Sequence, residues 1–535
     1  MRWLALVCLL ACGEVDRAPR WQPGTATVPR RGGTLRIATP NAISTLDPTR
    51  ANEEISIIAI HAIVEGLVGY KGDTIELEER LASKLPDISQ DGLVYRFVLR
   101  ADLRYGDGDP ILASDFKRAF EEVLRTPDSL YATKLLPIAG AQDYADKKAE
   151  TCTGIVASDA DRTLEIRITE PTATFLNDLA IPFAAPLSER QAKLDPSERR
   201  THPLASGPFE LVEWDEGHRV ELRRRAYYYE PKRQYLDGIV LLENVPRELQ
   251  FLMFDRGGLD AIERMSAPDQ LWVTSQPAWT PYVRTLPMLY AFGSRMNTTK
   301  WPFKDLRVRQ AFNYAVNKSH ITKLLTGTAV ASHGVLPPGA FGRDDTLQPY
   351  PHDPVKARKL LADAGIPDGL TLTYVTLEDE EALKLAASLQ SDLAEVGVRI
   401  EISVMSLGEW GAAIGKEDGP SFSLATWSGE YADPRVLLEG LFHSREIATT
   451  MNSSFYNNPT LDKILDEARA MPRDSEERAA KYREAEQILY DDAPWIWGYH
   501  QTATEVIQPY VHGFGSHPIW IRDYTSTWLD DKVPR

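Results

Sequence analysis

Four consecutive residues, Trp427-Ser428-Gly429-Glu430, carry the groups needed to bind a cationic ligand. The carboxylate of Glu430 can accept charge-assisted hydrogen bonds from an ammonium group. Such a bond contributes roughly 1.5–3 kcal/mol when a buried pair keeps its other partners. Ser428 and Gly429 allow another main chain to approach, and their amides or carbonyls could pair with it as an added strand does. Alternatively, Trp427 fills a core, and Glu430 caps a helix or faces solvent in an ordinary loop.

The sequence lacks the motifs of the common hydrolases, metalloproteases and nucleotide-binding enzymes. It contains no GxSxG, no HExxH, no P-loop and no GxGxxG after a strand. Asp107 and Asp109 in YGDGDP do not supply the full ligand series of an EF-hand loop, so we interpret this segment as a solvated turn. We therefore expect no enzyme activity, no catalytic residue, no metal and no cofactor. A hydrolase with an unrecognised pair of carboxylates is the enzymatic alternative.

The composition of the 535-residue chain is that of a globular protein, with 43% hydrophobic and 26% charged residues. This length suggests roughly two to four domains. The net charge of -17 argues against nucleic acid as the main partner, because nucleic-acid-binding surfaces are basic.

The first twelve residues predict a bacterial lipoprotein signal. Leu4 to Ala11 is an apolar run that is too short to span a bilayer as a helix. The segment LLACG at 9–13 resembles the lipobox, whose cysteine is acylated and becomes the mature N-terminus. The resemblance makes Cys12 the expected lipid-attachment residue. A simple secretory signal with a chance cysteine is the alternative.

The next segment, 13–32, predicts a flexible tether between this anchor and a folded body. It is rich in Pro, Arg, Thr and Gly and has no hydrophobic period. If Cys8 leaves with the signal and Cys12 carries lipid, Cys152 has no cysteine left to pair with, so no internal disulfide is expected.

A strand-helix-strand unit is the clearest architecture in the sequence. The segment 370–374 alternates as a strand, 379–396 has an apolar helical stripe, and 398–404 alternates again. This order predicts a right-handed βαβ unit with parallel strands, whose carboxyl ends form ligand-binding crevices in α/β proteins.

Similar patterns predict further elements. Strands are expected at 33–40, 93–100, 163–168 and 493–499, and helices at 57–68, 113–124, 303–318, 353–365 and 474–490. The helix at 303–318 has an apolar stripe typical of core packing, made of Val308, Ala311, Phe312, Ala315 and Val316. We expect Arg307 and Arg309 to be surface or bridging charges.

Several segments, taken together and in order, resemble the bacterial extracytoplasmic solute-binding proteins of family 5, the oligopeptide- and dipeptide-binding group. They are LDP at 46–48, VEGLVGY at 64–70, LRADLRYGDGDPILASDFKRAFEEVL at 99–124, SGPFELVEW at 206–214, FKDLRVRQAFNYAVNK at 303–318 and TWSGEYADP at 426–434. Tyr105 and Phe209 stand where the family has tryptophan and tyrosine. The resemblance covers about residues 33 to 530.

This resemblance implies an α/β, two-lobed, periplasmic-binding-protein type II-like fold with mixed sheets, a hinge between the lobes and an extra subdomain. The implied boundaries are 33–68, 176–285 and 500–535 for lobe 1, 69–175 for the subdomain, and 286–499 for lobe 2.

The resemblance also implies roles for individual residues. In peptide-binding members of the family, the acid of the Trp loop pairs with the α-ammonium of the ligand, and Glu430 matches that position. Tyr131 matches a tyrosine near the ligand backbone, with a packed aromatic as the alternative. Lys416 and Arg264 are candidate contacts for an anionic ligand group, with solvated surface charges as the alternative.

The sequence departs from the oligopeptide-binding pattern at the cations that meet ligand carboxylates. Leu424, Glu380 or Glu381, and Thr326 stand near the family's arginine, histidine and lysine. The resemblance therefore leaves the length of a peptide ligand open and is compatible with a cationic or otherwise unusual ligand.

The function implied is that of a monomeric receptor, lipid-anchored outside the cytoplasm of a bacterium, that captures peptides for the permease subunits of an ABC transporter. The alternative within the family is a receptor for an oligosaccharide, a metal chelate or an opine.

Overall fold

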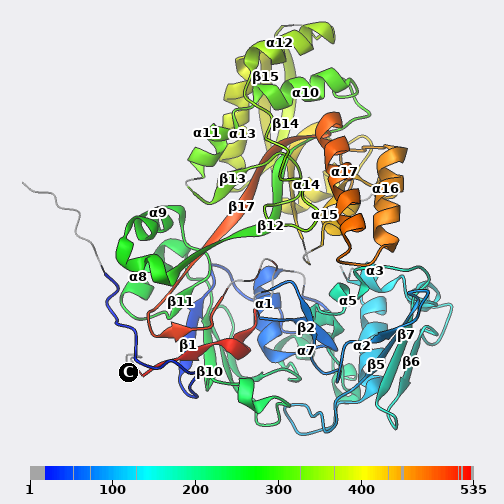
Figure 1. Ribbon diagram of the computed structural model, residues 1–535, viewed down its shortest axis with the longest axis vertical. Helices are drawn as coiled ribbons and strands as arrows, with labels where there is room; N and C mark the ends of the chain where they lie inside the picture. The colour runs from blue at the N-terminus through cyan, green and yellow to red at the C-terminus, as the bar shows by residue number, and fades with distance from the viewer. Residues whose placement is uncertain are drawn as a thin grey trace, which may run out of the picture.

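The computed structural model describes residues 18–531, except for residues 52, 73, 128, 130, 326, 367, 430, 432, 448–450, 516, 518, 520 and 521. Three main sheets define three bodies, which we call lobe 1, the subdomain and lobe 2. Lobe 1 and the subdomain lie side by side at the bottom of Figure 1, and lobe 2 lies above them. This arrangement confirms the expected two-lobed α/β fold class. The expected domain boundaries stay a prediction.

Lobe 1 is built on a four-stranded sheet in the order β1-β10-β9-β8, namely β1 (Thr34–Ala38), β10 (Gly238–Leu242), β9 (Arg219–Arg224) and β8 (Phe209–Asp215). β1 lies parallel to β10, and the other pairs are antiparallel. Leu35 and Ile37 are buried, as their alternation predicts. The helix predicted at 57–68 is instead α1 (Glu54–Ile63), because Val64 has an extended backbone and the chain then enters β2 (Val68–Tyr70).

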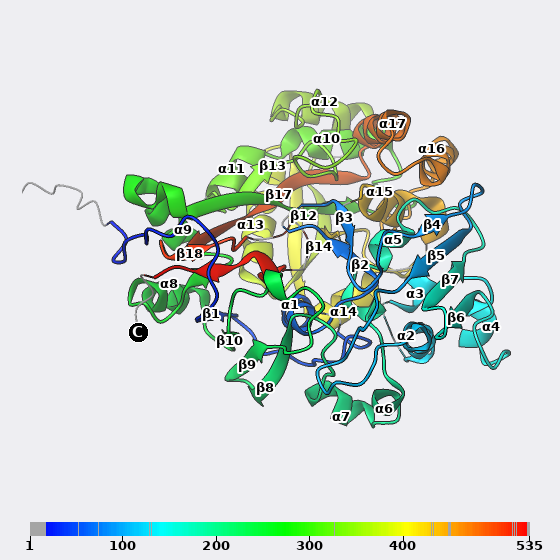
Figure 2. The ribbon, with the colours of Figure 1, turned by 60° about the horizontal axis from the view of Figure 1, so that its bottom comes forward.

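The subdomain carries a second four-stranded sheet in the order β4-β5-β7-β6, namely β4 (Asp87–Ile88), β5 (Val94–Val98), β7 (Thr163–Arg167) and β6 (Ile155–Ser158). Tyr95 and Phe97 of β5 are buried, as the alternation of this strand predicts. The helix α2 (Ala113–Arg125) lies beside the sheet in Figure 2. Asp115 fixes its first turn, because its carboxylate accepts the Leu112 N–H and the Tyr105 hydroxyl, each at 3.0 Å.

Lobe 2 is built on the largest sheet, in the order β11-β17-β12-β16-β14-β15 with β13 on β17. The strands of this sheet are β11 (Ala261–Ile262), β12 (Val283–Met296), β13 (Ala329–Ala331), β14 (Leu370–Leu377), β15 (Val398–Met405), β16 (Phe422–Ser428) and β17 (Trp495–Ile507). Of these, β11 lies in lobe 1, where it contacts β1 and α8. β14 and β15 are parallel, and α13 (Glu380–Ala394) connects them. The predicted βαβ unit is therefore confirmed.

The helix predicted at 303–318 is two helices, α10 (Leu306–Ala315) and α11 (Lys318–Leu324). Its predicted apolar stripe is buried, and Arg307 pairs with Asp305 near the surface. Of the two roles expected for Arg309, the structure shows the bridging one. Its side chain is buried, and its guanidinium donates to the carbonyls of Phe303 at 2.9 Å and Asp492 at 2.8 Å.

The other helices of lobe 2 are α12 (Pro354–Asp363), α14 (Leu407–Ile414), α15 (Arg435–Phe442), α16 (Pro459–Ala470) and α17 (Glu476–Asp492). The helix predicted at 353–365 is α12, and Asp353 caps it by accepting the Lys356 N–H at 2.9 Å. The helix α17 begins after Ser475 rather than at Asp474, because the Ser475 hydroxyl accepts the Arg478 N–H at 3.2 Å.

The remaining elements are short. They are β3 (Leu77–Glu79), β18 (Val511–His512), β19 (Trp528–Leu529), α3 (Ala132–Leu135), α4 (Ala141–Ala145), α5 (Phe175–Asp178), α6 (Glu189–Ala192), α7 (Pro196–Thr201), α8 (Arg247–Asp255), α9 (Ala267–Ser275), and 3-10 turns at 182–184, 231–233, 277–282, 444–446 and 524–526. Within the described ranges, no helix combines the length and the apolar character needed to cross a membrane.

The two lobes are joined along one edge by β12 and β17. These antiparallel strands pair from Val283↔Val506 to Arg295↔Trp495 and run from the lower body into lobe 2 in Figure 1. At the opposite edge, lobe 2 meets the subdomain through side chains. Arg469 forms an ion pair with Glu170 at 2.7 Å, and Arg435 donates to the Thr174 hydroxyl at 2.7 Å.

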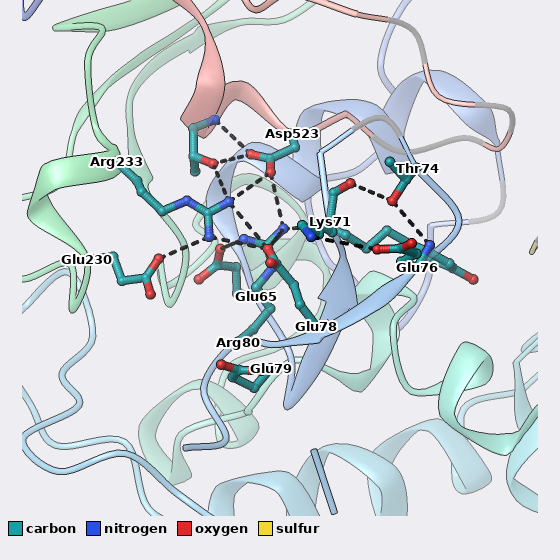
Figure 3. A network of polar contacts seen from close by, with 12 residues as sticks. Glu65, Lys71, Thr74, Glu76, Glu78, Glu79, Arg80, Glu230, Arg233 and Asp523 are labelled. Carbon is teal, nitrogen blue, oxygen red and sulfur yellow. Dashed lines mark hydrogen bonds and ion pairs between the residues drawn. The ribbon is translucent and has the colours of Figure 1, made fainter. Parts of the chain in front are cut away.

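A buried ionic network fixes the subdomain to lobe 1. Arg80, which follows β3, approaches Asp523 at 3.2 Å, Glu78 at 3.1 Å and Glu65 at 3.8 Å. Figure 3 shows Arg80 and Arg233 converging on Asp523. Burial lowers the pKa of Arg80, but the facing carboxylates raise it more, so its pKa lies above the usual value. The opposite charges of this network offset one another, so its role is structural: it holds the subdomain against lobe 1.

Candidate functional site

The Trp loop, residues 426–434, begins inside the large sheet. β16 runs between β12 and β14 and places Trp427 opposite Ala291 and Ser428 opposite Tyr290. Gly429 then donates its N–H to the Leu289 carbonyl at 2.6 Å. A Cβ on Gly429 would lie 3.1 Å from the Cβ of Leu289 and 3.3 Å from Val436, which explains the glycine. Because its N–H is taken, Gly429 could offer a ligand its carbonyl only.

Glu430, the residue on which the sequence argument centres, lies outside the described residues, as does the lipobox residue Cys12. Their proposed roles therefore stay predictions.

Asp433 anchors the far end of the Trp loop, a role that the sequence analysis did not assign. Its carboxylate forms two parallel hydrogen bonds with Arg478, from Nη1 at 2.7 Å and from Nη2 at 2.8 Å. Both side chains are buried, and Arg478 also donates to the Tyr482 hydroxyl at 2.6 Å. Asp433 further accepts the Arg435 N–H at 3.0 Å, which fixes the start of α15. The bidentate pair thus holds the loop against α17.

On the lobe 2 side of the loop lies a cavity of about 390 Å³, which we call the aromatic cavity. Its walls include Trp410 of α14, Trp427 of β16, Trp495 of β17, Ile414, Leu441 and Met451. The indole N–H groups of all three tryptophans are buried and have no hydrogen-bond partner in the described part of the chain. A buried indole N–H normally finds an acceptor. These N–H groups remain unsatisfied among the described residues, and the mostly apolar walls make the cavity suited to an apolar or aromatic group.

On the lobe 1 side lies a cavity of about 240 Å³, which we call the charged cavity. It is lined by the segment after β1, the start of α1, and Arg247, Gln250, Glu263 and Arg264. Arg264 forms an ion pair with Glu54 and lies over the ring of Tyr290 at 5.8 Å. Burial lowers the pKa of Arg264, but the Glu54 charge and Tyr290 outweigh this, so its pKa is raised.

Tyr290 connects the charged cavity to the Trp loop. Its backbone is the ladder partner of Ser428, and its hydroxyl donates to Glu54 at 3.4 Å. The structure therefore brings together four of the residues singled out in the sequence, namely Trp427, Ser428, Gly429 and Arg264.

The other two candidates lie elsewhere. Tyr131 is buried at the start of α3, and its ring stacks on Phe183 with centroids 4.7 Å apart. One turn later, Lys134 lies over the ring of Tyr431 in the Trp loop at 5.2 Å, so α3 is close to the loop. Lys416 is exposed in the turn after α14. Contact of either residue with a ligand stays a prediction.

Several residues of these cavities were missed in the sequence. Trp495 lies in a segment predicted only as a strand, and Trp410 lies in a segment for which the sequence predicts no element. Glu54 and Arg247 of the charged cavity, and the adjoining Tyr290, come from three distant segments. For Trp410 and Trp495, the one available signal was the density of tryptophan. For Glu54, Arg247 and Tyr290, no spacing rule links the three segments.

Known proteins resemble this chain over most of its length. Residues 76–449 match the model of the bacterial extracellular solute-binding proteins, family 5 Middle. The glutathione-binding protein GsiB of Escherichia coli O1:K1 / APEC is 27% identical over 467 residues, which cover 86% of this chain and 87% of that protein.

Solved structures agree with this match. The ABC transporter-associated periplasmic binding protein DppA from Helicobacter pylori, in complex with the peptide STSA, is 26% identical with a TM-score of 0.77 and covers 94% of this chain and 99% of its own. The clavulanic acid biosynthesis oligopeptide binding protein 2 has a TM-score of 0.85 and covers 96% of this chain and 99% of its own. At 21% identity, this likeness concerns the fold alone.

Proposed function

Because the chain belongs to the bacterial extracellular solute-binding proteins of family 5, we propose that it captures peptides outside the cytoplasm and delivers them to an ABC transporter. The observation that carries the peptide assignment is the position of the Trp loop: Trp427 lines the aromatic cavity, and Tyr290, the ladder partner of Ser428, contacts Glu54 and Arg264 of the charged cavity. A relative that binds glutathione and a similar structure that holds the peptide STSA support it.

In this proposal, the ligand lies between the lobes with its α-ammonium on Glu430. A carboxylate in a closed crevice is a strong partner for an ammonium, and a buried ammonium without one is heavily penalised. One ligand side chain enters the aromatic cavity. Main-chain contacts with Ser428 and the Gly429 carbonyl would hold peptides irrespective of their side chains. Tyr131 and Lys416 are secondary candidates.

The test is the Glu430→Gln variant, titrated by calorimetry with a peptide that has a free amine and with its N-acetylated form. The variant should weaken binding of the free-amine peptide about ten- to a hundredfold and change binding of the acetylated peptide little. Glu417→Gln, at an exposed acid of the same lobe, is the matched control and should leave both affinities unchanged. Equal losses for both peptides in Glu430→Gln would count against the ammonium role.

Ligand class is tested by thermal shift with peptides, oligosaccharides, metal chelates and opines. A ligand at about a hundred times its dissociation constant stabilises by about 2.7 kcal/mol. Stabilisation by intact peptides supports the proposal. Stabilisation by one of the other classes alone would assign that class, and turnover of the ligand would indicate a hydrolase.

The proposal includes a lipid anchor at Cys12, a residue outside the described range. Mass spectrometry of the mature N-terminus should find an acylated Cys12, and Cys12→Ser should release the protein from the membrane. An unmodified N-terminus elsewhere would favour a simple secretory signal.

A further inference from the structure

The charged cavity of lobe 1 contains a guanidinium that forms no ion pair with any described residue. Arg247 is the first residue of α8 and lines this cavity together with Arg264 and Glu54. Its one hydrogen bond within the described chain runs from Nη1 to the backbone carbonyl of Arg264, at 3.3 Å. No carboxylate of a described residue lies within ion-pair distance of it, whereas Arg264 beside it is paired with Glu54.

The electrostatic surroundings of Arg247 are unfavourable to its charge. Burial lowers the pKa of Arg247, and the neighbouring charge of Arg264 lowers it further, with partial compensation from Glu54, Glu381 and Glu248. An arginine nevertheless stays protonated in proteins. The site therefore holds a partly desolvated positive charge, which an anion placed against it would stabilise.

We infer that the charged cavity binds a carboxylate of the ligand on Arg247. This inference rests on the proposed function and adds the ligand class, a peptide or peptide-like solute with a free carboxylate. The planar guanidinium keeps several N–H donors beyond the one used by the Arg264 carbonyl, so it can hold a carboxylate through two parallel hydrogen bonds.

The charge balance of the cavity favours a monoanion over a phosphate dianion. Glu54 neutralises Arg264, and Glu263 is paired with Arg522 at 2.8 Å. Arg247 is thus the one lining cation that lacks an acidic partner within the described residues. A single carboxylate matches a single unpaired guanidinium, whereas a second negative charge would face the carboxylates of Glu54 and Glu263.

The connection through Tyr290 predicts a dependence on ligand length. Tyr290 lies opposite Ser428, its hydroxyl contacts Glu54, Glu54 pairs with Arg264, and the Arg264 carbonyl accepts from Arg247. This chain of contacts fixes Arg247 relative to the Trp loop. An extended peptide grows by about 3.3 Å per residue. If its amine is held at the Trp loop, as the proposed function has it, the carboxylate site on Arg247 therefore favours the peptide length that spans this separation.

The experiment compares free-acid and C-terminally amidated peptides of two to five residues, all with free amines, by calorimetry. At one length, the wild-type protein should bind the acid about ten- to a hundredfold more tightly than the amide, and Arg247→Gln should bring this ratio close to one. The variant should keep the preference for free-amine over N-acetylated peptides. Arg256→Gln, an exposed arginine at the end of the same helix, is the matched control and should keep both preferences.

The possible failures are distinguishable. If peptides bind with a dependence on the free amine but acids and amides bind equally at every length, the carboxylate site is overturned and the proposed function stands. The same holds if Arg247→Gln leaves the acid preference intact. If no peptide binds the wild-type protein, the proposed function fails and the carboxylate site fails with it.

Discussion

The aromatic cavity at β16 and the charged cavity, which Tyr290 links to β16, are built from opposite kinds of side chain, and each belongs to one lobe. The aromatic cavity is made by residues of lobe 2, with three indoles in its walls. The charged cavity is made by residues of lobe 1, with two guanidinium groups and several carboxylates. A ligand held between the lobes would meet apolar surface on lobe 2 and charged groups on lobe 1.

This difference suggests how the two lobes divide recognition. Apolar burial is roughly proportional to area and tolerates many side chains, so the aromatic cavity can supply affinity with little selectivity. Charge pairing depends on distance and direction, so the charged cavity can select one end of a ligand.

Replacing Asp433 with asparagine should cause the largest loss of stability, on the lobe 2 side of the site. The change leaves the buried Arg478 guanidinium without its counter-ion, and breaking such a pair costs about 3–5 kcal/mol. Thermal or urea unfolding should report this loss of stability. Asp363→Asn, in the exposed pair with Lys359, is the control and should cost less than about 1 kcal/mol. Similar small losses for both variants would show that Asp433 does not anchor the loop.

Truncating Trp410 should remove affinity for large apolar side chains. In Trp410→Ala, a peptide with phenylalanine should lose about 1–3 kcal/mol of binding energy, because that side chain is no longer covered. The matching peptide with alanine should bind as before, and calorimetry with the pair measures the difference. Leu407→Ala, at a cavity residue that is 68% exposed, should have a smaller effect. Equal losses for the two peptides would contradict a side-chain pocket.

The stability of lobe 2 should rise with pH above neutrality because of Lys318. Its ammonium is buried, and burial lowers its pKa to about 7, although Asp392 opposes the shift. A depressed folded-state pKa contributes stability that is present above the unfolded value near 10.5 and is lost as pH falls through about 7.

The free energy of unfolding should therefore increase by about 2 kcal/mol between pH 7 and pH 9. Lys318→Met should flatten this dependence, since methionine keeps the apolar stem without a titrating group. An unchanged slope in the variant would assign the pH dependence to other groups.

Removing Arg469 should have the smallest effect, because its partner Glu170 is 51% exposed at the side-chain level. We expect Arg469→Ala to change ligand affinity by less than about 1 kcal/mol, with a loss that shrinks as salt is added. A salt titration of the dissociation constant measures it. A large loss of affinity that salt does not reduce would mean that the contact between lobe 2 and the subdomain contributes far more to ligand binding than an exposed ion pair can.

The sequence predicted elements with strong periodicity better than it predicted contacts. The βαβ unit from Leu370 to Met405 was recognised because both strands alternate and Gly397 stops the helix, where its positive φ favours glycine. The apolar stripe predicts one helix over 303–318, but the helix is interrupted between Ala315 and Lys318. For Arg309, the sequence leaves a surface and a bridging role open, because the Asp492 carbonyl to which it donates lies 183 positions away in the chain.

The site was predictable only where one motif carried it. Trp427, Ser428 and Gly429 are adjacent in the sequence, and the resemblance pointed to them directly. The charged cavity joins α1, α8 and the end of β11, whose spacing in the chain follows no local rule, so only the folded chain reveals Arg247 beside Arg264. Likewise, the pairing of Asp433 with Arg478 spans 45 positions.

A crystal structure with a bound peptide tests the central claim most directly. We predict that the peptide nitrogen lies about 3 Å from the carboxylate of Glu430 and that one side chain enters the aromatic cavity. A peptide-bound structure in which the carboxylate of Glu430 points into solvent, away from the ligand, would contradict the account.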